Sequence, residues 1–303
     1  MFKNVMMYRM VSAWEQTIAK LEAALEEGRF AECSASQEKS VGWIPPRGDA
    51  HGPLAEVVAG QWILKLMVEV KVLPGTVVKR KAEEQLAHIE ASTGRKPGKK
   101  EARDIREDAR LSLLPLAFTK QSSVLVWIDP DARLLVLSAA SQSRADEVMT
   151  CLIKAVDGLA VQLINTQMSP AAAMAIWLST KEAPQSFSVD RECELKAADE
   201  SKAVVRYTRH ALDTDEVSKH IAEGKVPTRL AMTWNDHVSF VLTEALQLKK
   251  LAVLDVVFEA VGSSGDRKED EFDTDVAIAT GELRKLIPDL LEALGGEVVP
   301  LRS

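Results

Sequence analysis

The rest of this chain is organised around residues 76–120, which read TVVKRKAEEQLAHIEASTGRKPGKKEARDIREDARLSLLPLAFTK. From Lys65 to Lys120 the sequence holds 13 Lys and Arg against 8 Asp and Glu, a net charge of +5, whereas the whole chain carries −7. An acidic protein that keeps one long basic segment often uses that segment to bind a polyanion. The same charges also fit a solvated helical surface whose Glu and Lys pairs serve only solubility.

This stretch has the spacing of two helices. Apolar side chains return about every 3.6 residues, first at Val78, Ala82, Leu86 and Ile89 and then at Ala102, Ile105, Ala109 and Leu113. The pattern predicts helices over residues 77–92 and 99–114. Gly94 favours the left-handed residue that ends a helix, and Pro115 stops the second one. We therefore expect a helical hairpin with a basic tip.

The segments before and after the hairpin, up to residue 180, mix strands and helices. Alternating apolar residues predict strands over residues 2–11, 31–34, 61–73, 122–128 and 134–138. In the third of these strands, Lys65, Glu69 and Lys71 predict one solvated face. Helical spacing predicts helices over residues 14–25, 143–156 with Ser143 as N-cap, and 170–178. The GWIPP segment, residues 42–46, predicts a rigid extended loop.

The rest of the chain, residues 181–303, also mixes strands and helices. We expect short strands over residues 186–189, 192–195, 203–208, 228–234, 237–242 and 248–257, and helices over residues 213–222 and 273–294. The fold class is therefore α+β, with mostly antiparallel sheets and an inserted basic helical arm. The expected domains are a central α+β domain (1–75 with 121–180), the arm (76–120) and a C-terminal α+β domain (181–303).

The composition of the sequence indicates the cell compartment in which the protein is expected. The 303 residues contain no run of 18 apolar residues, and the first residues lack the pattern of a signal peptide, so we expect a cytoplasmic protein without a membrane segment. Cys33, Cys151 and Cys193 lie far apart and form no CxxC pair. This spacing argues against disulfides and against a structural zinc site.

Catalytic motifs are mostly missing from the sequence. The segment from Gly94 to Lys99 resembles a phosphate-binding loop, but its glycines are too close and Lys100 replaces the Ser or Thr that would hold magnesium. An acidic patch could bind divalent metal in a nuclease, and it comprises Asp266, Glu269, Asp270, Glu271, Asp273 and Asp275. Asp273 and Asp275 also suit the start of a helix. We predict no catalytic residue and no cofactor, and keep a metal-dependent nuclease as an alternative.

Several short motifs together resemble one bacterial family. They are Phe2-Lys3-Asn4, Met7-Tyr8-Arg9, residues 42–46, Gly94-Arg95-Lys96, residues 113–118, Trp127-Ile128-Asp129, Gly224-Lys225-Val226, Leu230-Ala231, Trp234, Thr280-Gly281-Glu282-Leu283 and Leu294-Gly295-Gly296-Glu297. In order and spacing they resemble the recombination-associated RdgC family from residue 2 to residue 297. The tail from Val298 to Ser303 and the segment from Gly262 to Lys268 have no counterpart in this resemblance.

The resemblance implies a function that the charge pattern only suggests. RdgC-family proteins form a ring-shaped homodimer that encircles double-stranded or single-stranded DNA with little sequence preference. They restrain RecA-promoted strand exchange by occupying its substrate, are associated with the nucleoid and with replication, and are not enzymes. The alternative from the residues alone is a protein-interaction module whose basic arm binds an acidic protein.

The resemblance also suggests roles for individual residues. The arm matches the part through which two subunits close the ring, so Phe118, Leu113 and Leu116 are candidate dimer contacts. The candidate DNA-binding residues are Lys79, Arg80, Lys81, Arg95, Lys96, Lys99, Lys100, Arg103, Arg106, Arg110, Lys120, Arg209, Lys225 and Arg229. Arg209-His210-Ala211 stands where relatives carry two lysines and a glutamine. Phe118 also fits a core position, where truncation would cost about 3 to 5 kcal/mol.

Overall fold

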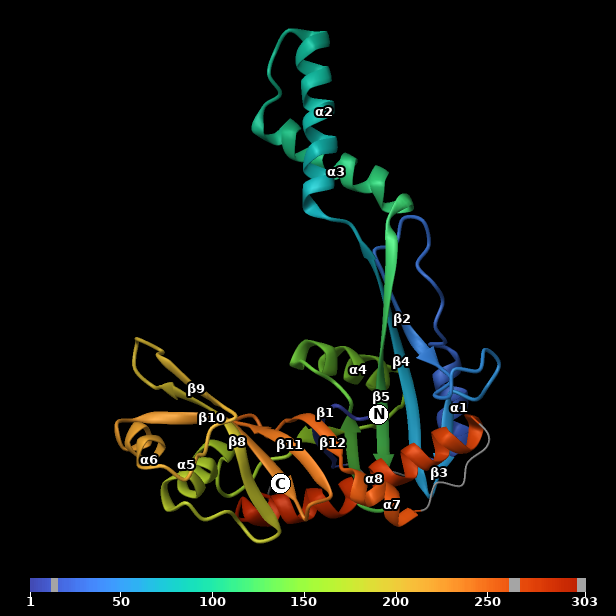
Figure 1. The fold of residues 1–303 in the computed structure, drawn as a ribbon. Coiled ribbons are helices and arrows are strands. Elements are labelled where there is room, and N and C mark those ends of the chain that lie inside the picture. Colours follow the sequence, from blue (N-terminus) through green and yellow to red (C-terminus); the bar gives the residue numbers. More distant parts are fainter. Residues whose placement is uncertain (12–15, 262–267, 299–303) are drawn as a thin grey trace.

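The computed structural model describes residues 1–11, 16–261 and 268–298, and it has the expected α+β architecture (Figure 1). Antiparallel pairs join one sheet in the order β2-β4-β5-β6-β1-β12-β11-β10-β8-β9, with β3 beside β4 and β7 beside β1. The strands are β1 Asn4–Met10, β2 Lys39–Ile44, β3 Ala55–Val58, β4 Gln61–Val72, β5 Phe118–Asp129, β6 Leu134–Leu137, β7 Val161–Leu163, β8 Phe187–Ala197, β9 Val204–Thr208, β10 Lys225–Trp234, β11 Val238–Thr243 and β12 Leu248–Val253.

Helices cover the sheet on both faces. They are α1 Ile18–Glu26, α2 Gly75–Thr93, α3 Lys99–Leu113, α4 Gln142–Ala155, α5 Pro170–Thr180, α6 Asp215–Ala222, α7 Asp255–Val261 and α8 Lys268–Ala293, with a short 3-10 turn at Leu114–Leu116. One core packs α1 and α4 against the half of the sheet that holds β4, β5 and β6. A second core packs α5, α6 and α8 against the opposite face and extends under the other half. None of the helices in the described ranges is both long and apolar enough to cross a bilayer.

The N-terminal strand β1 joins the two halves of the sheet. Asn4 and Val5 pair with β12, whereas the residues from Met6 to Arg9 pair with β6. Val5 and Met7 point into the core beneath α5 and α8, and Met6 and Tyr8 point into the core beneath α1 and α4. Because side chains alternate along a strand, β1 contributes to both cores at once.

The predicted helical hairpin is confirmed, and it forms an arm on the end of a ribbon built from the long strands β4 and β5, with β2 beside β4 as far as Val70 (Figure 1). β4 and β5 pair from Trp62↔Ile128 to Val72↔Phe118. Gly94 adopts the expected left-handed conformation, with φ of 71°, at the end of α2. A small separate core of Ala82, Ile105 and Ala109 holds α2 against α3. The arm therefore has its own core, and the ribbon joins it to the rest of the chain, with an ion pair from Arg110 of α3 to Glu38 as a further contact.

Two predictions about the N-terminal part are wrong. Residues 42–44 belong to β2, which pairs with β4. A side chain at Gly42 would lie 2.4 Å from the Cα of Phe30, so glycine lets the chain after α1 pass directly beside this strand. Residues 31–34 form no strand. Their main chain is held instead by side chains, as when Ser40 donates to the carbonyl of Ala31.

Other differences concern where elements begin and end. The strands predicted at 186–189 and 192–195 are one strand, β8, with bulges against β10. The strand predicted to Val257 ends at Val253, because α7 begins at Asp255. Ser141 rather than Ser143 caps α4, since its side chain accepts a hydrogen bond from the backbone N–H of Arg144. Strands β3 and β7 were not predicted, and Trp14 lies outside the described residues. The three-domain division stays a prediction.

Glu69 was predicted on the solvated face of β4 but is only 2% exposed. Its carboxylate accepts hydrogen bonds from the backbone N–H of Cys33 at 2.5 Å and from Nε2 of Gln121 at 3.1 Å. The bond from Cys33 is the main reason why the pKa of Glu69 is lowered. Glu69 therefore fastens the segment after α1 to the lower part of the ribbon.

The separate cores predict that the arm can be removed. Replacing residues 73–117 by Asn-Gly would join Val72 to Phe118 through a two-residue hairpin turn. We expect a cooperatively unfolding protein, because no residue of α2 or α3 belongs to either large core. Circular dichroism during thermal unfolding measures this, with the full chain as the reference. Loss of the cooperative transition would contradict it.

A second prediction concerns acid stability. A glutamate whose pKa is lower in the folded chain stabilises fully above its unfolded pKa of about 4.3, and this contribution disappears as pH falls through the folded pKa. The Glu69→Gln variant should be less stable than the parent at pH 7, and the difference should shrink below about pH 4. Urea unfolding at both pH values measures it, with exposed Glu83→Gln as the control. A difference that is independent of pH would refute this role.

Candidate nucleic-acid interface

The cations of the arm fall into two groups. Some pair with acidic neighbours, at 3.7 Å for Lys79–Glu83, 4.0 Å for Arg80–Glu84 and 2.8 Å for Arg95–Glu101. Lys96 lies 4.0 Å from Glu90, and Arg110 pairs with Glu107 and Glu38. Exposed pairs of this kind contribute little to stability and leave the cations accessible. Within the described ranges, the exposed cations without an ion pair on the arm are Lys81, Lys99, Lys100, Arg103 and Arg106.

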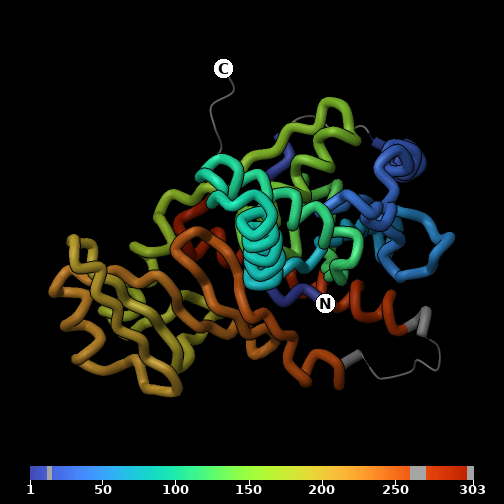
Figure 2. Tube along the Cα trace, turned by 90° about the horizontal axis from the view of Figure 1, so that it is seen from above, coloured from blue at the N-terminus to red at the C-terminus, as the bar shows by residue number. Residues whose placement is uncertain are grey.

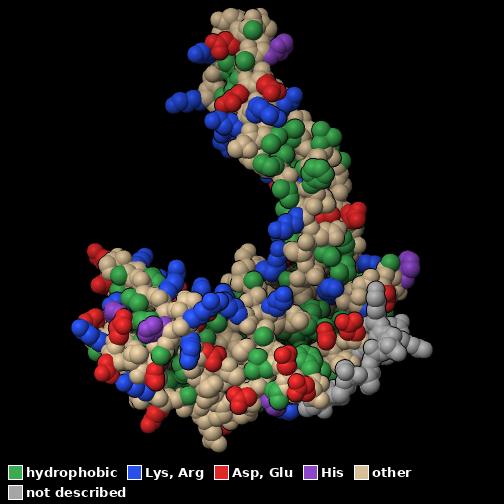
Figure 3. All heavy atoms as spheres, in the orientation of Figure 1, with side chains coloured by type: hydrophobic (Ala, Val, Ile, Leu, Met, Phe, Trp, Pro, Cys, Tyr) green, Lys and Arg blue, Asp and Glu red, His purple; other side chains and the backbone are tan. Residues whose placement is uncertain are grey.

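An apolar surface lies where the arm meets the ribbon. Phe118 is 86% exposed and Leu116 is 79% exposed, whereas Leu113 is partly buried. Val72 is the cross-strand partner of Phe118, and Val70 lies on the same face two residues away. We call Val70, Val72, Leu116 and Phe118 the arm-base patch; Figure 3 shows apolar side chains gathered at this level. The core interpretation of Phe118 is therefore wrong for the single subunit, and exposed apolar patches usually mark contact surfaces.

A second basic surface lies on the sheet half formed by β8–β12. Leu195 and Leu230 point into the core with α5 and α8, so the alternate residues of these strands face the other way. The outward cations are Lys196, Arg206, Arg229, Lys249 and Lys250, which we call the sheet-face patch. Arg206 pairs with Glu194 at 2.6 Å and Lys250 with Glu192 at 2.6 Å. Cations therefore outnumber the carboxylates that they contact on this face.

The arm and the body enclose a hollow. Figure 3 shows the arm curving over the body, with Lys and Arg side chains along the inner side of the curve. Seen from above in Figure 2, α2 and α3 stand over the middle of the molecule while β8–β10 extend to one side. The hollow is open on one side in the single subunit and has the sign of charge that attracts phosphate groups.

The remaining predicted residues lie in different settings. Lys120 is exposed on the ribbon, and Arg229 is exposed on β10. Arg209 is exposed directly after β9 with φ of 55°. The Lys225 side chain is 17% exposed and lies 3.6 Å from Glu223. Its Nζ is also 3.0 Å from Nδ1 of His220, which must accept because an ammonium group only donates. Lys225 is therefore already engaged within the subunit.

Sequence reasoning missed four of the five cations of the sheet-face patch and named only Arg229. The signal that could have found them is the alternation in β8 and β9, where Glu194, Lys196 and Arg206 alternate with residues that point into the core. The structure brings these residues onto one face, whereas the predicted arm residues form a separate group above them.

The acidic patch of the nuclease alternative is only partly described. Asp266 and the side chains of Glu269 and Asp270 lie outside the described residues. Asp273 pairs with Arg47 at 2.5 Å and is therefore part of a structural contact between α8 and the segment after β2. Among the described side chains, no three His, Cys, Asp or Glu residues are grouped as a metal site would require. The three cysteines are unpaired, and burial raises the pKa of Cys193 to about 12.

Comparison with known proteins finds one family over nearly the full length of the chain. Residues 1–297 match the family model described as "RdgC: Putative exonuclease, RdgC". The chain is 42% identical over 301 residues to the recombination-associated protein RdgC of Dechloromonas aromatica, with 98% of each chain covered. It is 44% identical over 296 residues to that of Herminiimonas arsenicoxydans and 43% identical over 297 residues to that of a Janthinobacterium species, again with 98% coverage of each chain. The chain belongs to the RdgC family of recombination-associated proteins.

Proposed function

We propose that two copies of this chain close into a ring that holds DNA, double-stranded or single-stranded, without regard to sequence. The observation that carries the proposal is the basic hollow between the arm and the sheet-face patch (Figure 3). In this role the protein restrains RecA-promoted strand exchange because it occupies the DNA that RecA needs. It acts in the cytoplasm on nucleoid DNA, in recombination linked to replication.

The chemistry of the hollow supports contact with phosphates rather than bases. Its cations stand on a helical arm and on a flat sheet face, and flexible Lys and Arg side chains there can follow a charged backbone. Phosphate contacts position a protein on DNA and carry no sequence information. A duplex has one charge per about 1.7 Å of its axis, so binding gains mainly from the release of counterions.

The distribution of charge supports one orientation of the DNA. α8 packs on the sheet face opposite to the sheet-face patch, and its exposed carboxylates include Glu271, Asp275 and Glu292. The cations of the hollow attract the phosphates of DNA, and the carboxylates on the α8 side of the same subunit repel them. This arrangement favours DNA inside a closed ring over DNA along its outer side.

The arm-base patch supports closure by a second copy. Its side chains are apolar and exposed, and they stand at the rim of the hollow rather than within the core. A two-fold axis would bring the same patch of both subunits together, so each apolar contact would be made twice. Two hollows that face each other would then form one basic opening.

We expect the arm to contribute directly to DNA affinity. Replacing Lys96, Lys99, Lys100 and Arg103 by Ala should weaken duplex binding and reduce the slope of log K against log salt by up to about 3 to 4 per subunit, because each lost phosphate contact removes about 0.9. Fluorescence anisotropy with a labelled duplex between 50 and 200 mM salt measures both quantities, as these are roughly the salt concentrations over which such contacts act.

The control variant replaces Lys20, Lys219 and Lys285, exposed lysines on α1, α6 and α8, by Ala. Its affinity and salt slope should equal those of the parent. If the arm variant also keeps the parental affinity and slope, the arm has no part in DNA binding. Absence of any shift at physiological salt by the parent protein would favour the interaction-module alternative.

The exonuclease named in the family description is the competing function. The same binding reactions test it when the duplex carries an end label and magnesium is added. We expect a shifted but uncut duplex. Progressive shortening from the labelled end, by protein purified to constant specific activity, would instead establish the nuclease.

If the arm-base patch closes the ring, replacing Phe118 should weaken self-association without unfolding the subunit. At concentrations at which both proteins are monomeric, the Phe118→Ser variant should keep the parental unfolding midpoint, because a largely exposed side chain adds little to subunit stability. It should also weaken self-association, since an apolar anchor at the centre of a contact carries much of its energy. Sedimentation velocity over a range of concentrations measures the shift toward monomer. An unchanged dimer would exclude the arm-base patch as a closing contact.

A further inference from the structure

Strand β8 is longer than the strand that covers its outer side. β9 pairs with β8 only from Glu192 to Lys196. The first part of β8, from Phe187 to Val189, pairs with β10 on its inner side. Among the described residues its outer side has no strand beside it, and the nearest backbone hydrogen bond on that side joins the carbonyl of Arg191 to the N–H of His210 at 3.1 Å.

The ladder geometry shows which backbone groups face this gap. The N–H of Asn235 donates to the carbonyl of Ser186 at 2.8 Å, so these residues form a hydrogen-bonded pair of the antiparallel ladder. Such pairs alternate with pairs that do not bond each other. Ser188↔Thr233 is therefore bonded to β10, and Val189↔Met232 is not. The N–H and C=O of Val189 consequently point outward, toward the uncovered side.

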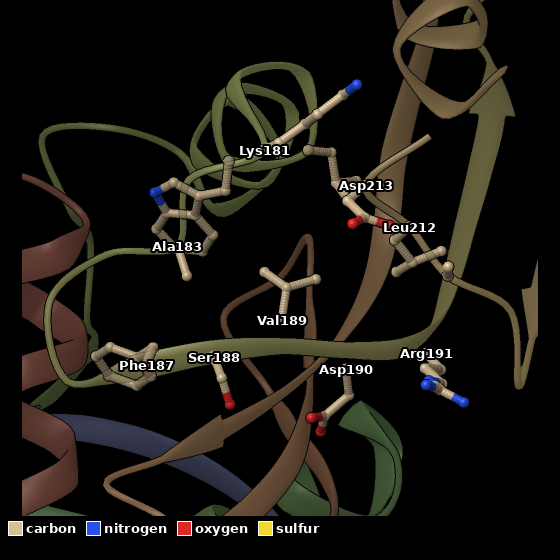
Figure 4. Close-up of a pocket in the computed structure, with 12 residues that line it drawn as sticks. Lys181, Ala183, Phe187, Ser188, Val189, Asp190, Arg191, Leu212 and Asp213 are labelled. Carbon is tan, nitrogen blue, oxygen red and sulfur yellow. The ribbon is translucent and has the colours of Figure 1, made fainter. Parts of the chain in front are cut away.

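A cavity of about 460 Å³ lies beside this uncovered segment (Figure 4). Val189 points into it from β8, whereas Ser188 and Asp190 point to the opposite side of the strand. The other apolar walls are Trp177, Phe187 and Leu212, from α5, β8 and the segment before α6. These three side chains are 8% exposed or less, so the walls are held in place by the core.

Four charged side chains line the cavity, and Figure 4 draws two of them, Asp190 and Arg191, on the side of β8 away from Val189, so Lys181 and Asp213 set the charge of its mouth. Lys181 and Asp213 stand there (Figure 4), but Lys181 is neutralised by Asp215 at 2.8 Å. Asp213 is exposed, and among the described residues its carboxylate has no ion-pair partner. An occupant with a basic side chain next to its apolar anchor would therefore complement both the walls and the mouth.

We propose that the uncovered edge of β8 and its cavity form a docking site for an extended peptide segment of a partner protein, with an apolar residue flanked by Lys or Arg. The segment pairs with Val189 as an added strand. Its apolar side chain enters the cavity against Trp177 and Leu212, and a basic side chain two residues away, on the same face, reaches Asp213. Adding a strand to an exposed edge is a common mode of peptide recognition, in which the backbone provides affinity and alternate side chains provide specificity. This site is separate from the basic hollow and goes beyond the proposed DNA function.

The test uses the full chain and a fluorescein-labelled peptide, Arg-Thr-Leu-Thr-Arg, whose leucine and arginines lie on one face when it is extended. We expect saturable binding by fluorescence anisotropy. The Asp213→Lys variant should bind about fivefold more weakly or worse, because an attraction becomes a repulsion. Asp157→Lys, which changes an exposed carboxylate at the end of α4, is the matched control and should bind as the parent does.

A backbone variant separates strand addition from simple charge attraction. Val189→Pro removes an outward N–H and leaves the bonded Ser188↔Thr233 pair intact, so it should reduce peptide affinity at least about tenfold. Asp213→Lys keeps the wild-type backbone and thus covers the case in which the proline variant fails to fold. The control peptide has the same sequence with an N-methylated leucine, which removes the amide donor that faces Val189 in an antiparallel pair, and it should not bind.

Several outcomes would overturn the proposal. They include no saturable binding of the first peptide at millimolar concentration, equal binding of the N-methylated peptide, and equal loss in the Asp157→Lys control. Concentration-dependent self-association that the Val189→Pro variant abolishes would also overturn it, because a second copy would then occupy the edge. Duplex affinity is measured in parallel and should be the same in the Asp213→Lys variant and the parent, so failure here leaves the DNA function untouched.

Discussion

The backbone ladder between β4 and β5 is the constraint on which the rest of this molecule depends. Its lower part is sandwiched between two cores, where Leu64 and Val126 are completely buried. Its upper part leaves the body and loses both layers, so Val70, Val72 and Phe118 become exposed. Because β4 and β5 stay paired in one register, the strand pair that is buried in the core also extends beyond it and holds two helices away from the body. The hollow, its basic lining and the arm-base patch all follow from this projection.

The body that carries this arm is held rigid by its continuous sheet. β1 pairs with strands of both halves and fills both cores, so the half that carries the arm and the half that carries the sheet-face patch are joined by backbone hydrogen bonds. Arg9 adds a paired contact to Glu297 near the C-terminal end of the described chain. Separate domains on a flexible linker would let the hollow change shape, whereas a continuous sheet fixes the distance between its two basic walls.

Much of this architecture could be predicted from the sequence because its signals are local. The arm helices follow from their spacing and from Gly94, and the α+β class follows from strands that succeed one another across short turns, such as those over residues 228–257. The failures concern long-range contacts. Phe118 has the large apolar side chain typical of a core residue, and only its pairing with Val72 beyond the edge of the body exposes it. Glu69 alternates like a solvated residue, yet a segment 36 residues earlier returns to bury it. Lys249 and Lys250 can be assigned to the exposed face of the sheet only once it is known that α5 and α8 cover the other face.

The central claim is that DNA passes through a closed opening and does not merely lie against a basic surface. The most direct measurement is retention on relaxed circular DNA, compared with the same molecule linearised, during a wash with rising salt. Salt screens phosphate contacts but does not weaken apolar closure at the arm-base patch. The account predicts protein that remains on circles at salt concentrations that strip it from linear DNA, where a ring can slide off the ends. Loss from both forms at the same salt concentration would contradict encirclement.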